Sequence, residues 1–446
     1  GDIDVRATVD ATGPMAAADV DADGDLDLFV GGRAVPGAYP RPASSRILIN
    51  QEGTLVVDPV RSQPFGAVGL VSGAIFSDVD LDGDPDLLLA LDWGPVRLFL
   101  NEGPGYRDAT DAWGLSQHPG RWNGIATGDL NADGRPDLVV TGWGNNTGKR
   151  ATPTLPIGLH AADLDGNGLV DIIESWTEAS GDELPTRGYL SLSTALPFIR
   201  RGAPSYEAFA RSTVVDLLGP RQTEVEVVRA ATLEHTMFLN RDGSFEAQLL
   251  PARTQRAPGF GVVVADFDLD GTEDVFMAQN FLSTPAGIAR YDAGRGELLL
   301  GDGHGGLTTI GARKSGIAVY GDARGAAVAD FDEDGRWDLA VGQNGEEILI
   351  FRGAAKPIGL RVHLVGGISN PDAVGASLRV VYADGEGPLR EIQAGSGYWS
   401  KNGNVQVFGL RANPQGVRVR WPEGRDEFFR MDPSSRDVVL RMGMGQ

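Results

Sequence analysis

Residues 19–30 read DVDADGDLDLFV, a stretch in which aspartate recurs at every second position before a short apolar run. Carboxylates held this close together repel one another unless a cation lies between them. Calcium takes roughly six to eight oxygen ligands, and alternate residues of a tight loop can direct their oxygens toward one centre. Aspartate and glycine are also common in ordinary turns. The stretch is therefore either a solvated acidic turn or a calcium loop, and one copy does not separate the two.

The same pattern recurs along the chain, and the recurrence favours the calcium loop. The motif D-x-D/N-x-D/N-G-x-x-D occurs six times, and the copies begin at Asp19, Asp78, Asp129, Asp163, Asp266 and Asp330. An EF-hand would need a glutamate at the twelfth position and a helix on each side. Five of the six twelfth positions are instead apolar strand residues, the set being Val30, Leu89, Val140, Glu174, Met277 and Val341. The sequence therefore predicts calcium loops within β-hairpins.

The spacing also predicts the ligands. Loop positions 1, 3, 5 and 9 would supply side-chain oxygens and position 7 a backbone carbonyl, with up to six Ca²⁺ as the cofactor. In the first three loops the predicted metal residues are Asp19, Asp21, Asp23, Asp25, Asp27, Asp78, Asp80, Asp82, Asp84, Asp86, Asp129, Asn131, Asp133, Arg135 and Asp137. In the last three they are Asp163, Asp165, Asn167, Leu169, Asp171, Asp266, Asp268, Asp270, Thr272, Asp274, Asp330, Asp332, Asp334, Arg336 and Asp338. Asn131 and Asn167 lower the charge of the third and fourth loops.

Each repeat reads as strand, loop, strand, turn and strand, often with a fourth strand behind. Repeated four-stranded antiparallel blades close into a β-propeller, so we expect an all-β fold with seven blades favoured and six as the alternative. The N-terminal segment IDVRATV, residues 3–9, alternates like a strand and is expected to close the ring. Residues 187–218 are predicted to form an insertion of two short helices. The segment after them either finishes the fourth blade or forms a blade without a metal loop.

The chain divides near residue 357. Residues 1–356 hold the repeats, and residues 357–446 alternate apolar and polar side chains as a small β-domain does. In this tail Tyr398 and Trp399 either present a binding surface or pack the tail against the propeller.

Composition excludes several classes of function. The net charge of −22 argues against binding to nucleic acid or to an anionic membrane. The chain has no cysteine, which excludes disulfides and thiolate metal sites, and no apolar run approaches membrane-spanning length. No signal peptide precedes Gly1, and a start without methionine is compatible with processing and export.

Two groups of residues resemble a known family. The D-x-D-x-D-G-x-x-D units resemble FG-GAP/VCBS repeats, and GLRVHLVGGISNPDAVGASLRVV, REIQAGSGYWSKNGNVQVFGL and GVRVRWPEGRDEFF resemble the ASPIC/UnbV domain. This pairing is typical of the cartilage-acidic-protein-like family in its bacterial form. The resemblance implies a calcium-binding protein that is secreted, on the cell surface or periplasmic. It implies no reaction.

A ligand site is expected on the propeller face opposite the metal loops. Counting six residues beyond the last aspartate of each loop reaches the end of the next strand. The residues there are predicted to form a ring: Arg33, Asp92, Trp93, Trp143, Trp176, Asn280 and Asn344, with Thr177 and Phe281 beside them. Aromatic faces with hydrogen-bonding groups suit sugars and other polar ligands. Such residues also occur at strand ends for turn and packing reasons alone.

These features predict a binding or assembly module for a carbohydrate or protein partner. The alternative is a lyase, dehydratase or cyclase acting on a sugar or secondary metabolite. The five histidines show no metal or triad spacing, and no phosphate loop or nucleophile motif is present. His118 is the best single candidate for chemistry, whereas His160 is expected to pack.

Overall fold

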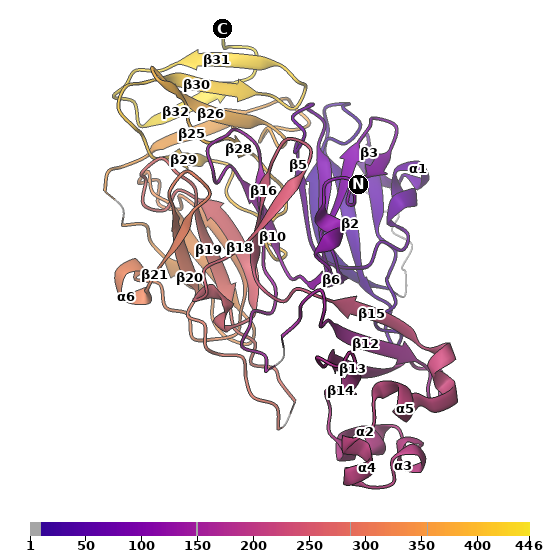
Figure 1. Cartoon of the computed structure of the whole chain (residues 1–446). Helices are drawn as coiled ribbons and strands as arrows, with labels where there is room; N and C mark the ends of the chain where they lie inside the picture. Colours follow the sequence, from indigo (N-terminus) through magenta and orange to yellow (C-terminus); the bar gives the residue numbers. More distant parts are fainter. Residues whose placement is uncertain (1–9, 149, 286, 355) are drawn as a thin grey trace.

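Strands dominate the computed structural model of the chain, which describes residues 10–148, 150–285, 287–354 and 356–446. The expected all-β class is confirmed, because antiparallel sheets make up most of the regular structure and the helices are short. A central group of sheets lies between an inserted unit and the C-terminal domain (Figure 1). The strand expected over residues 3–9 lies outside the described residues.

The central group consists of sheets whose strands come mostly from one stretch of chain each. The first sheet contains β1 (Ala11–Ala18), β2 (Asp27–Ala34), β3 (Arg46–Gln51) and β4 (Thr54–Val57). The second contains β5 (Leu70–Ser77), β6 (Asp86–Gly94), β7 (Arg97–Asn101) and β8 (Tyr106–Asp108), with β9 (Gly120–Arg121) paired to β6. The third contains β10 (Ile125–Gly128), β11 (Asp137–Val140), β16 (Thr236–Asn240) and β17 (Phe245–Leu249). The fourth contains β18 (Gly259–Ala265), β19 (Asp274–Gln279), β20 (Glu297–Gly301) and β21 (Leu307–Ile310), and the fifth contains β22 (Ala323–Ala329), β23 (Asp338–Gln343) and β24 (Leu349–Phe351).

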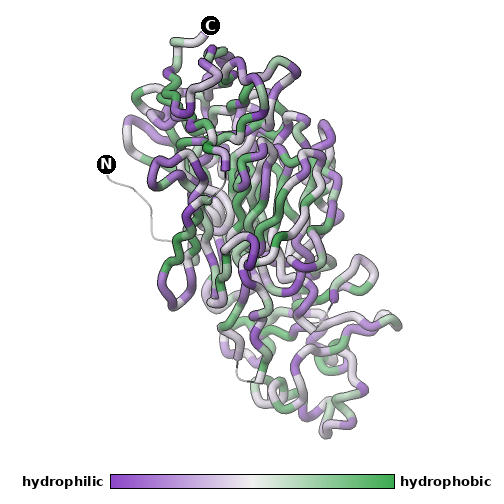
Figure 2. The backbone as a smooth tube through the Cα atoms, turned by 90° about the vertical axis from the view of Figure 1, so that its left-hand side faces the viewer, coloured by the Kyte–Doolittle hydropathy of each residue, from purple (hydrophilic) through white to green (hydrophobic). Residues whose placement is uncertain are grey.

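Apolar side chains hold these sheets together. Buried clusters join the first sheet to the second, the second to the third, the third to the fourth and the fourth to the fifth. Figure 2 shows the apolar residues concentrated along these strands. Burial of this apolar surface between sheets is the main favourable contribution to the stability of the arrangement. The sheets are therefore stacked as neighbouring blades of a propeller are.

The number of blades differs from the expectation of seven or six. Among the described residues five sheets follow one another in this way, and the hairpin of the fourth motif belongs to none of them. That hairpin forms a separate sheet of β12 (Ile157–Ala162), β13 (Asp171–Thr177), β14 (Glu183–Pro185) and β15 (Glu226–Ala230). This sheet is inserted between β11 and β16, so the third blade is completed only after the insertion returns. The segment after the helices is expected from the sequence to finish the fourth blade or to form a blade without a metal loop, and both expectations are wrong. Its first strand joins the inserted sheet, and the next two strands complete the third blade.

The inserted unit also holds more helices than expected. Four short helices stand where two were predicted: α2 (Tyr189–Ala195), α3 (Ile199–Gly202), α4 (Tyr206–Ala210) and α5 (Val214–Leu218). Pro197 and Pro204 interrupt the helical segment, because proline lacks the N–H that a continuing helix needs. Thr213 and Asp216 form a capping box that starts the last helix. The helices pack on the inserted sheet through a buried cluster of their own. Two further single-turn helices, α1 (Pro59–Ser62) and α6 (Ala312–Ser315), lie between blades.

The C-terminal strands form two packed sheets with a shared core. One sheet contains β25 (Leu360–Val365), β29 (Gln406–Phe408) and β32 (Asp437–Arg441). The other contains β26 (Ser377–Tyr382), β27 (Gly385–Glu386), β28 (Arg390–Glu391), β30 (Pro414–Arg420) and β31 (Asp426–Arg430). This small β-domain lies over the ends of the propeller blades (Figure 1).

A hairpin of the C-terminal domain, residues 394–403, enters the centre of the propeller. On its way in, Ala394 accepts a hydrogen bond from Ala17 of β1, and on its way out Gly403 donates one to Val328 of β22. The two sides of the hairpin pair between Ser396 and Ser400. The hairpin therefore occupies the axis around which the innermost strands are arranged.

Glycine is required at the turning point of this hairpin. Gly397 exchanges two backbone hydrogen bonds with Ile125 of β10, and its φ is +62°. A side chain there would place its Cβ 2.7 Å from the carbonyl oxygen of Val262 in β18. Only a residue without Cβ permits this close approach of two backbones.

Candidate metal loops and ligand cleft

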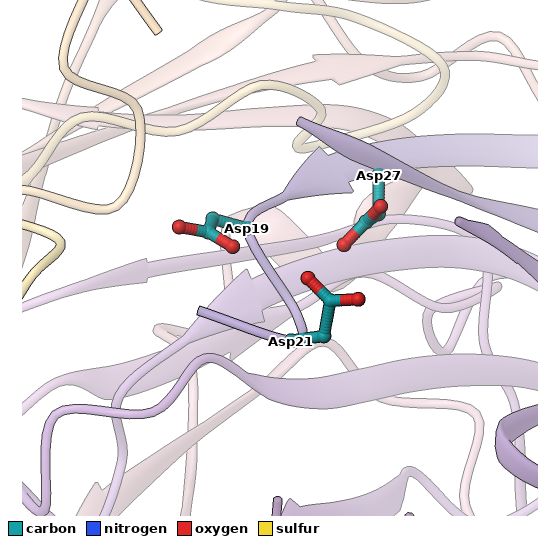
Figure 3. A group of neighbouring side chains, drawn as sticks. All are labelled: Asp19, Asp21 and Asp27. Atoms are coloured by element: carbon teal, nitrogen blue, oxygen red, sulfur yellow. The ribbon is translucent and has the colours of Figure 1, made fainter. Parts of the chain in front are cut away.

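Aspartates of the repeated motif converge in five of the six loops, within the described residues. In each of these loops one oxygen from positions 1, 3 and 9 lies within 4.8 Å of the others. Figure 3 shows the carboxylates of Asp21 and Asp27 facing each other, with one carboxylate oxygen of Asp19 on the side toward them. The corresponding groups are Asp78, Asp80 and Asp86; Asp163, Asp165 and Asp171; Asp266, Asp268 and Asp274; and Asp330, Asp332 and Asp338. In the third loop Asn131 stands at position 3 between Asp129 and Asp137.

Backbone hydrogen bonds hold each loop in this shape. The first aspartate accepts N–H groups of the loop itself, as Asp19 does from Asp23 and Gly24 at 3.1 and 3.0 Å. The glycine at position 6 has a φ between +78° and +108° in all six loops, a conformation that strongly favours glycine. The last aspartate accepts the N–H of position 2, as Asp27 does from Val20 at 2.9 Å. The loop geometry is therefore built into the motif, apart from any bound ion.

In the five blades the last aspartate also fixes the third strand. Asp27 accepts the N–H of Asn50 at 2.8 Å. Equivalent bonds of 2.8–2.9 Å run from Asn101 to Asp86, Asn240 to Asp137, Gly301 to Asp274, and Gly353 to Asp338. In the inserted sheet β14 pairs only with residues 175–177 of β13, at the end far from the loop. Asp171 accordingly lies outside this pattern.

Burial makes the aspartates costly to ionise without a cation. Burial raises the pKa of Asp19 to about 6 and that of Asp27 to about 7, and the neighbouring aspartates raise both further. For Asp86 and Asp274 the same causes raise the pKa to about 9 and about 8. Among the described residues, buried carboxylate oxygens of Asp21, Asp25, Asp78, Asp129 and Asp334 have no hydrogen-bond partner. Asp21 and Asp78 belong to the converging groups, and converging carboxylate oxygens are the ligands that a hard cation such as Ca²⁺ prefers, so the donor set fits calcium.

The remaining predicted metal residues occupy the outer part of each loop. At position 5 the side chain accepts the N–H of position 7, as Asp23 does from Asp25 at 3.1 Å and Asp270 from Thr272 at 2.9 Å. The position-5 side chain is therefore partly committed to the turn. The backbone carbonyl of position 7 stays a predicted ligand.

The C-terminal domain lies on the metal loops of the blades. In four loops the first aspartate contacts this domain through one carboxylate oxygen. The pairs are Arg420 with Asp78 at 3.5 Å, the Leu389 N–H with Asp129 at 2.9 Å, the Gly409 N–H with Asp266 at 2.9 Å, and Arg361 with Asp330 at 2.7 Å. The loop that begins at Asp266 makes a second contact, in which Glu273, buried beside Asp274, forms an ion pair with the buried Arg390 of the C-terminal domain. The face of the propeller that carries the candidate metal loops is thus an interface within the chain.

A cleft of about 550 Å³ opens on the opposite face, between the propeller and the inserted unit. Its propeller wall carries Trp93, Trp143, Phe281 and Tyr291. Trp143 packs against Phe281 with ring centroids 5.3 Å apart and meets Tyr291 edge-on at 6.1 Å. The opposite wall comes from β12, β13 and the segment leading into α2, and it includes the side chains of Glu174 and Arg187.

A buried ion pair supports the aromatic wall. The Arg121 guanidinium lies over both Trp93 and Trp143, at 4.5 and 4.7 Å from the ring centroids. Arg121 donates to Asp92 at 2.9 Å, and Arg33 lies 3.5 Å from the same carboxylate. Burial opposes ionisation of Asp92, but the two guanidinium groups hold its pKa below the usual range. The charge of Arg121 is therefore neutralised, and its main effect on the cleft is to fix the two indoles.

The predicted ring is brought together only in part. Trp93, Trp143 and Phe281 line the cleft, while Arg33 and Asp92 stand behind Trp93. Asn280 is fully buried, and its side-chain amide bonds the backbone of Gly294 and Gly321. Asn344 is exposed and its backbone N–H bonds the Asp322 carbonyl. On β13, Glu174 and Ser175 reach the cleft, whereas Trp176 pairs with Ile157 and Leu184, and Thr177 donates its hydroxyl to the Pro156 carbonyl.

His118, the candidate for chemistry, and His160, which is expected to pack, both have partners within the fold. His118 lies edge-on to Phe238 at 5.5 Å, and burial lowers its pKa. His160 shares its Nε2 atom between Ser175 at 3.1 Å and Glu183 at 2.7 Å. In a serine triad the acid binds the other ring nitrogen, so this arrangement does not activate Ser175.

The sequence pattern does not predict Arg121, Glu174, Arg187 or Tyr291 as ligand residues. Arg121 lies in the short strand β9 and Tyr291 in a loop, whereas Glu174 and Arg187 belong to the insertion, and no motif marks any of them as a ligand residue. Arg121 contacts the strand-end residues Trp93 and Trp143, but these contacts join segments that are distant in sequence. They can therefore be recognised only once the fold is known.

The fold and the two sites define a β-propeller-like repeat protein with a C-terminal β-domain over its candidate metal loops. Residues 78–140 match the FG-GAP-like repeat model, and residues 366–446 match the ASPIC and UnbV model. The chain therefore combines FG-GAP-like repeats with an ASPIC/UnbV domain, as the resemblance predicts.

One curated relative and several solved structures are similar to parts of the chain. Cartilage acidic protein 1 of Xenopus tropicalis is 29% identical over 206 residues, which cover 43% of this chain and 30% of that protein. The V. cholerae biofilm matrix protein Bap1 has a TM-score of 0.27 at 11% identity, covering 78% of this chain and 70% of that one. The exotype rhamnogalacturonan lyase YesX has a TM-score of 0.32 at 12% identity, covering 97% and 73%. Likeness at this level carries no inference about function. In the described part of the chain no helix is both long and apolar enough to span a membrane.

Proposed function

We propose that this protein is a calcium-stabilised binding module that holds a carbohydrate or protein partner in the aromatic cleft. The observation that carries the proposal is the convergence of Trp93, Trp143 and Phe281, which are distant in sequence, on one cleft of about 550 Å³. A concave site with aromatic walls and a few polar groups is the usual form of a site for small or extended ligands. Trp143 and Tyr291 expose enough of their rings to contact a ligand.

Calcium has a structural role in this proposal. Bound ions would neutralise the converging aspartates and so hold the hairpin loops on which the C-terminal domain rests. The cleft lies on the other face and contains no part of the metal loops, so calcium would support the site without touching the ligand. We further propose that the protein is secreted, on the cell surface or periplasmic.

Catalysis is the second candidate function. A lyase, dehydratase or cyclase would need an acid and a base in the cleft, and Glu174 and Tyr291 are the groups available there. Burial raises the pKa of Tyr291, and Glu174 raises it further, which makes the phenol a weaker acid and disfavours the phenolate that a base would need. Binding is therefore the better-supported function.

The test uses the purified, calcium-loaded chain on an array of immobilised glycans and purified extracellular proteins. Trp143→Ala is expected to abolish binding, while Ile350→Ala, a change of an exposed side chain on β24, is the matched control. Equal binding by the Trp143→Ala variant, with an unchanged melting temperature, would exclude the cleft as the site. Release of a modified product from a bound glycan would instead favour the enzyme.

A further inference from the structure

The tip of the central hairpin presents a tryptophan on the same face as the cleft. Trp399 is 54% exposed although it comes from the C-terminal domain on the far side of the propeller. Its indole N–H donates to the carbonyl of Ser72, near the start of β5, at 3.1 Å. One face of the ring stacks on Tyr398 with a centroid distance of 5.3 Å and an interplanar angle of 8°. The indole is therefore held at one edge and one face, and a large part of its remaining surface is open.

Aromatic contacts connect this indole to the cleft. Tyr398 packs edge-on against Phe260 at 5.4 Å, and Phe260 stacks with Phe281 at 6.4 Å. Phe281 lines the cleft and contacts Trp143. The Arg324 guanidinium covers Phe260 at 3.9 Å and Phe281 at 5.2 Å, which fixes the middle of the row. We call these residues, Trp143, Phe281, Phe260, Tyr398 and Trp399, the aromatic row.

Packing of the hairpin does not account for Trp399. A residue that served only to anchor the hairpin would gain most by burying its whole ring, since burial of apolar area is the source of the free energy. Tyr398 already provides that anchor against Phe260. Trp399 instead keeps half of its surface in solvent and has a φ of +53°, which is unusual for a bulky residue. Trp93, in the cleft wall, has a φ of +64°. Strained backbone of this kind is found where a side chain is held for a ligand.

The charges around the cleft indicate an uncharged ligand. Arg121 is neutralised by Asp92, and the remaining charged side chains on the cleft wall are Glu174 and Arg187, of opposite sign. Neither of these two has an ion-pair partner within the described residues. The whole chain carries −22 charges, which disfavours a polyanion.

We propose that Trp399 forms a second subsite for the ligand of the cleft, so that the complete site takes a linear, neutral glycan long enough to reach both. This inference rests on the proposed function of the cleft. The C–H face of one sugar stacks on Trp143 and that of a sugar further along the glycan stacks on Trp399, and the polar groups of the cleft fix the register. The C-terminal domain thus contributes to recognition through the centre of the propeller.

The test is calorimetric titration of the full, calcium-loaded chain with neutral oligosaccharides of glucose, mannose and xylose, each as a trimer and a hexamer. An oligogalacturonate hexamer is the acidic comparison. We expect at least one neutral hexamer to bind about tenfold more tightly than its trimer, a difference of about 1.4 kcal/mol. Trp399→Ala should reduce the affinity for the hexamer to that for the trimer, and Trp399→Phe should retain most of the difference in affinity between the two. Val439→Ala, which changes an exposed side chain of the same domain, is the control.

The outcomes separate the two proposals. Hexamer binding that is unchanged in Trp399→Ala, or no gain from trimer to hexamer, overturns the second subsite and leaves the cleft intact. Tighter binding of the acidic hexamer overturns the assignment of a neutral ligand. Absence of binding by every oligosaccharide overturns carbohydrate recognition at the cleft and the second subsite with it. If Trp399→Ala lowers the melting temperature, the comparison is made with Trp399→Phe and Trp399→Leu, which keep an apolar side chain at the tip.

Discussion

Replacing Asp86 by alanine tests whether the last aspartate of a blade loop stabilises the whole blade. Asp86 is fully buried and accepts the N–H groups of Val79 and Asn101 at 3.1 and 2.9 Å. It thereby joins the metal loop to the third strand of its sheet. Asp171 has the same position in the inserted sheet, but it is only half-buried and accepts the N–H of Leu164 at 3.0 Å. Asp171→Ala is therefore the matched control.

The expected difference follows from the hydrogen bonds. A hydrogen bond to a charged group contributes roughly 1.5–3 kcal/mol, so the loss of both bonds in Asp86→Ala should cost about 3–6 kcal/mol. The two N–H groups are left buried without an acceptor, which places the effect toward the upper end. Asp171→Ala loses one partly exposed bond and should cost about 1–2 kcal/mol. At about 2 °C per kcal/mol for a chain of this size, the melting temperatures should fall by about 6–12 °C and 2–4 °C.

The assay is thermal unfolding followed by circular dichroism in saturating calcium, at one scan rate for all variants because unfolding of a large chain is often irreversible. Limited proteolysis at 25 °C reports the same loss independently. Equal destabilisation by Asp86→Ala and Asp171→Ala would refute the reasoning, because the third-strand bond distinguishes the two sites.

Three further predictions concern the metal loops and their interface. Removing calcium with a chelator should lower the melting temperature by more than about 10 °C. The melting temperature should rise again with the concentration of free calcium, because an ion that binds only the folded state stabilises it by mass action. A melting temperature that does not change would exclude structural calcium. In chelator, the free energy of unfolding should fall as pH rises from 5 to 8, because burial raises the pKa of Asp27, Asp137 and Asp266 to about 7 and the folded state then holds protons that the unfolded state releases. Denaturant midpoints measured across this range should show the decrease in chelator and lose it when calcium is added. Stability that rises with pH in chelator would contradict the prediction. Arg390→Ala should lower the free energy of unfolding by about 3–5 kcal/mol, because it leaves the buried Glu273 without its cation. Adding Glu273→Gln to this variant should recover part of the lost melting temperature. If it does not, the destabilisation comes from other contacts of Arg390 in the interface.

The sequence by itself determined the loops and the character of the strands. Aspartate at alternate positions and glycine at position 6 specify a loop through covalent spacing and nearest-neighbour hydrogen bonds, as in the bonds from Asp23 and Gly24 to Asp19. The alternation in LRVHLV and SLRVVY likewise specifies half-buried strands, which are β25 and β26. These features are local, so a single stretch of chain is enough to read them.

Only the tertiary structure decided how the units are joined. The fourth motif satisfies the same local rules as the others, yet its hairpin forms an inserted sheet, because β15 pairs with β12 and the chain returns to β11 only at β16. No local feature of the sequence around residue 163 predicts the pairing of β15 with β12. A strand pairs with whichever partner buries the most apolar surface, and that choice depends on residues far away in sequence.

The ligand face shows the same division. Counting from each loop located the strand-end tryptophans, and Trp93 and Trp143 do line the cleft. The count could not show that the Asn280 amide is used by the backbone of Gly294, nor that Arg121 lies between the two indoles. It also could not place Trp399, which reaches this face only because a hairpin of another domain passes between the innermost strands. Side-chain direction and the path of that hairpin are set by packing across the whole fold, and packing is a property of the assembled surfaces rather than of any one segment.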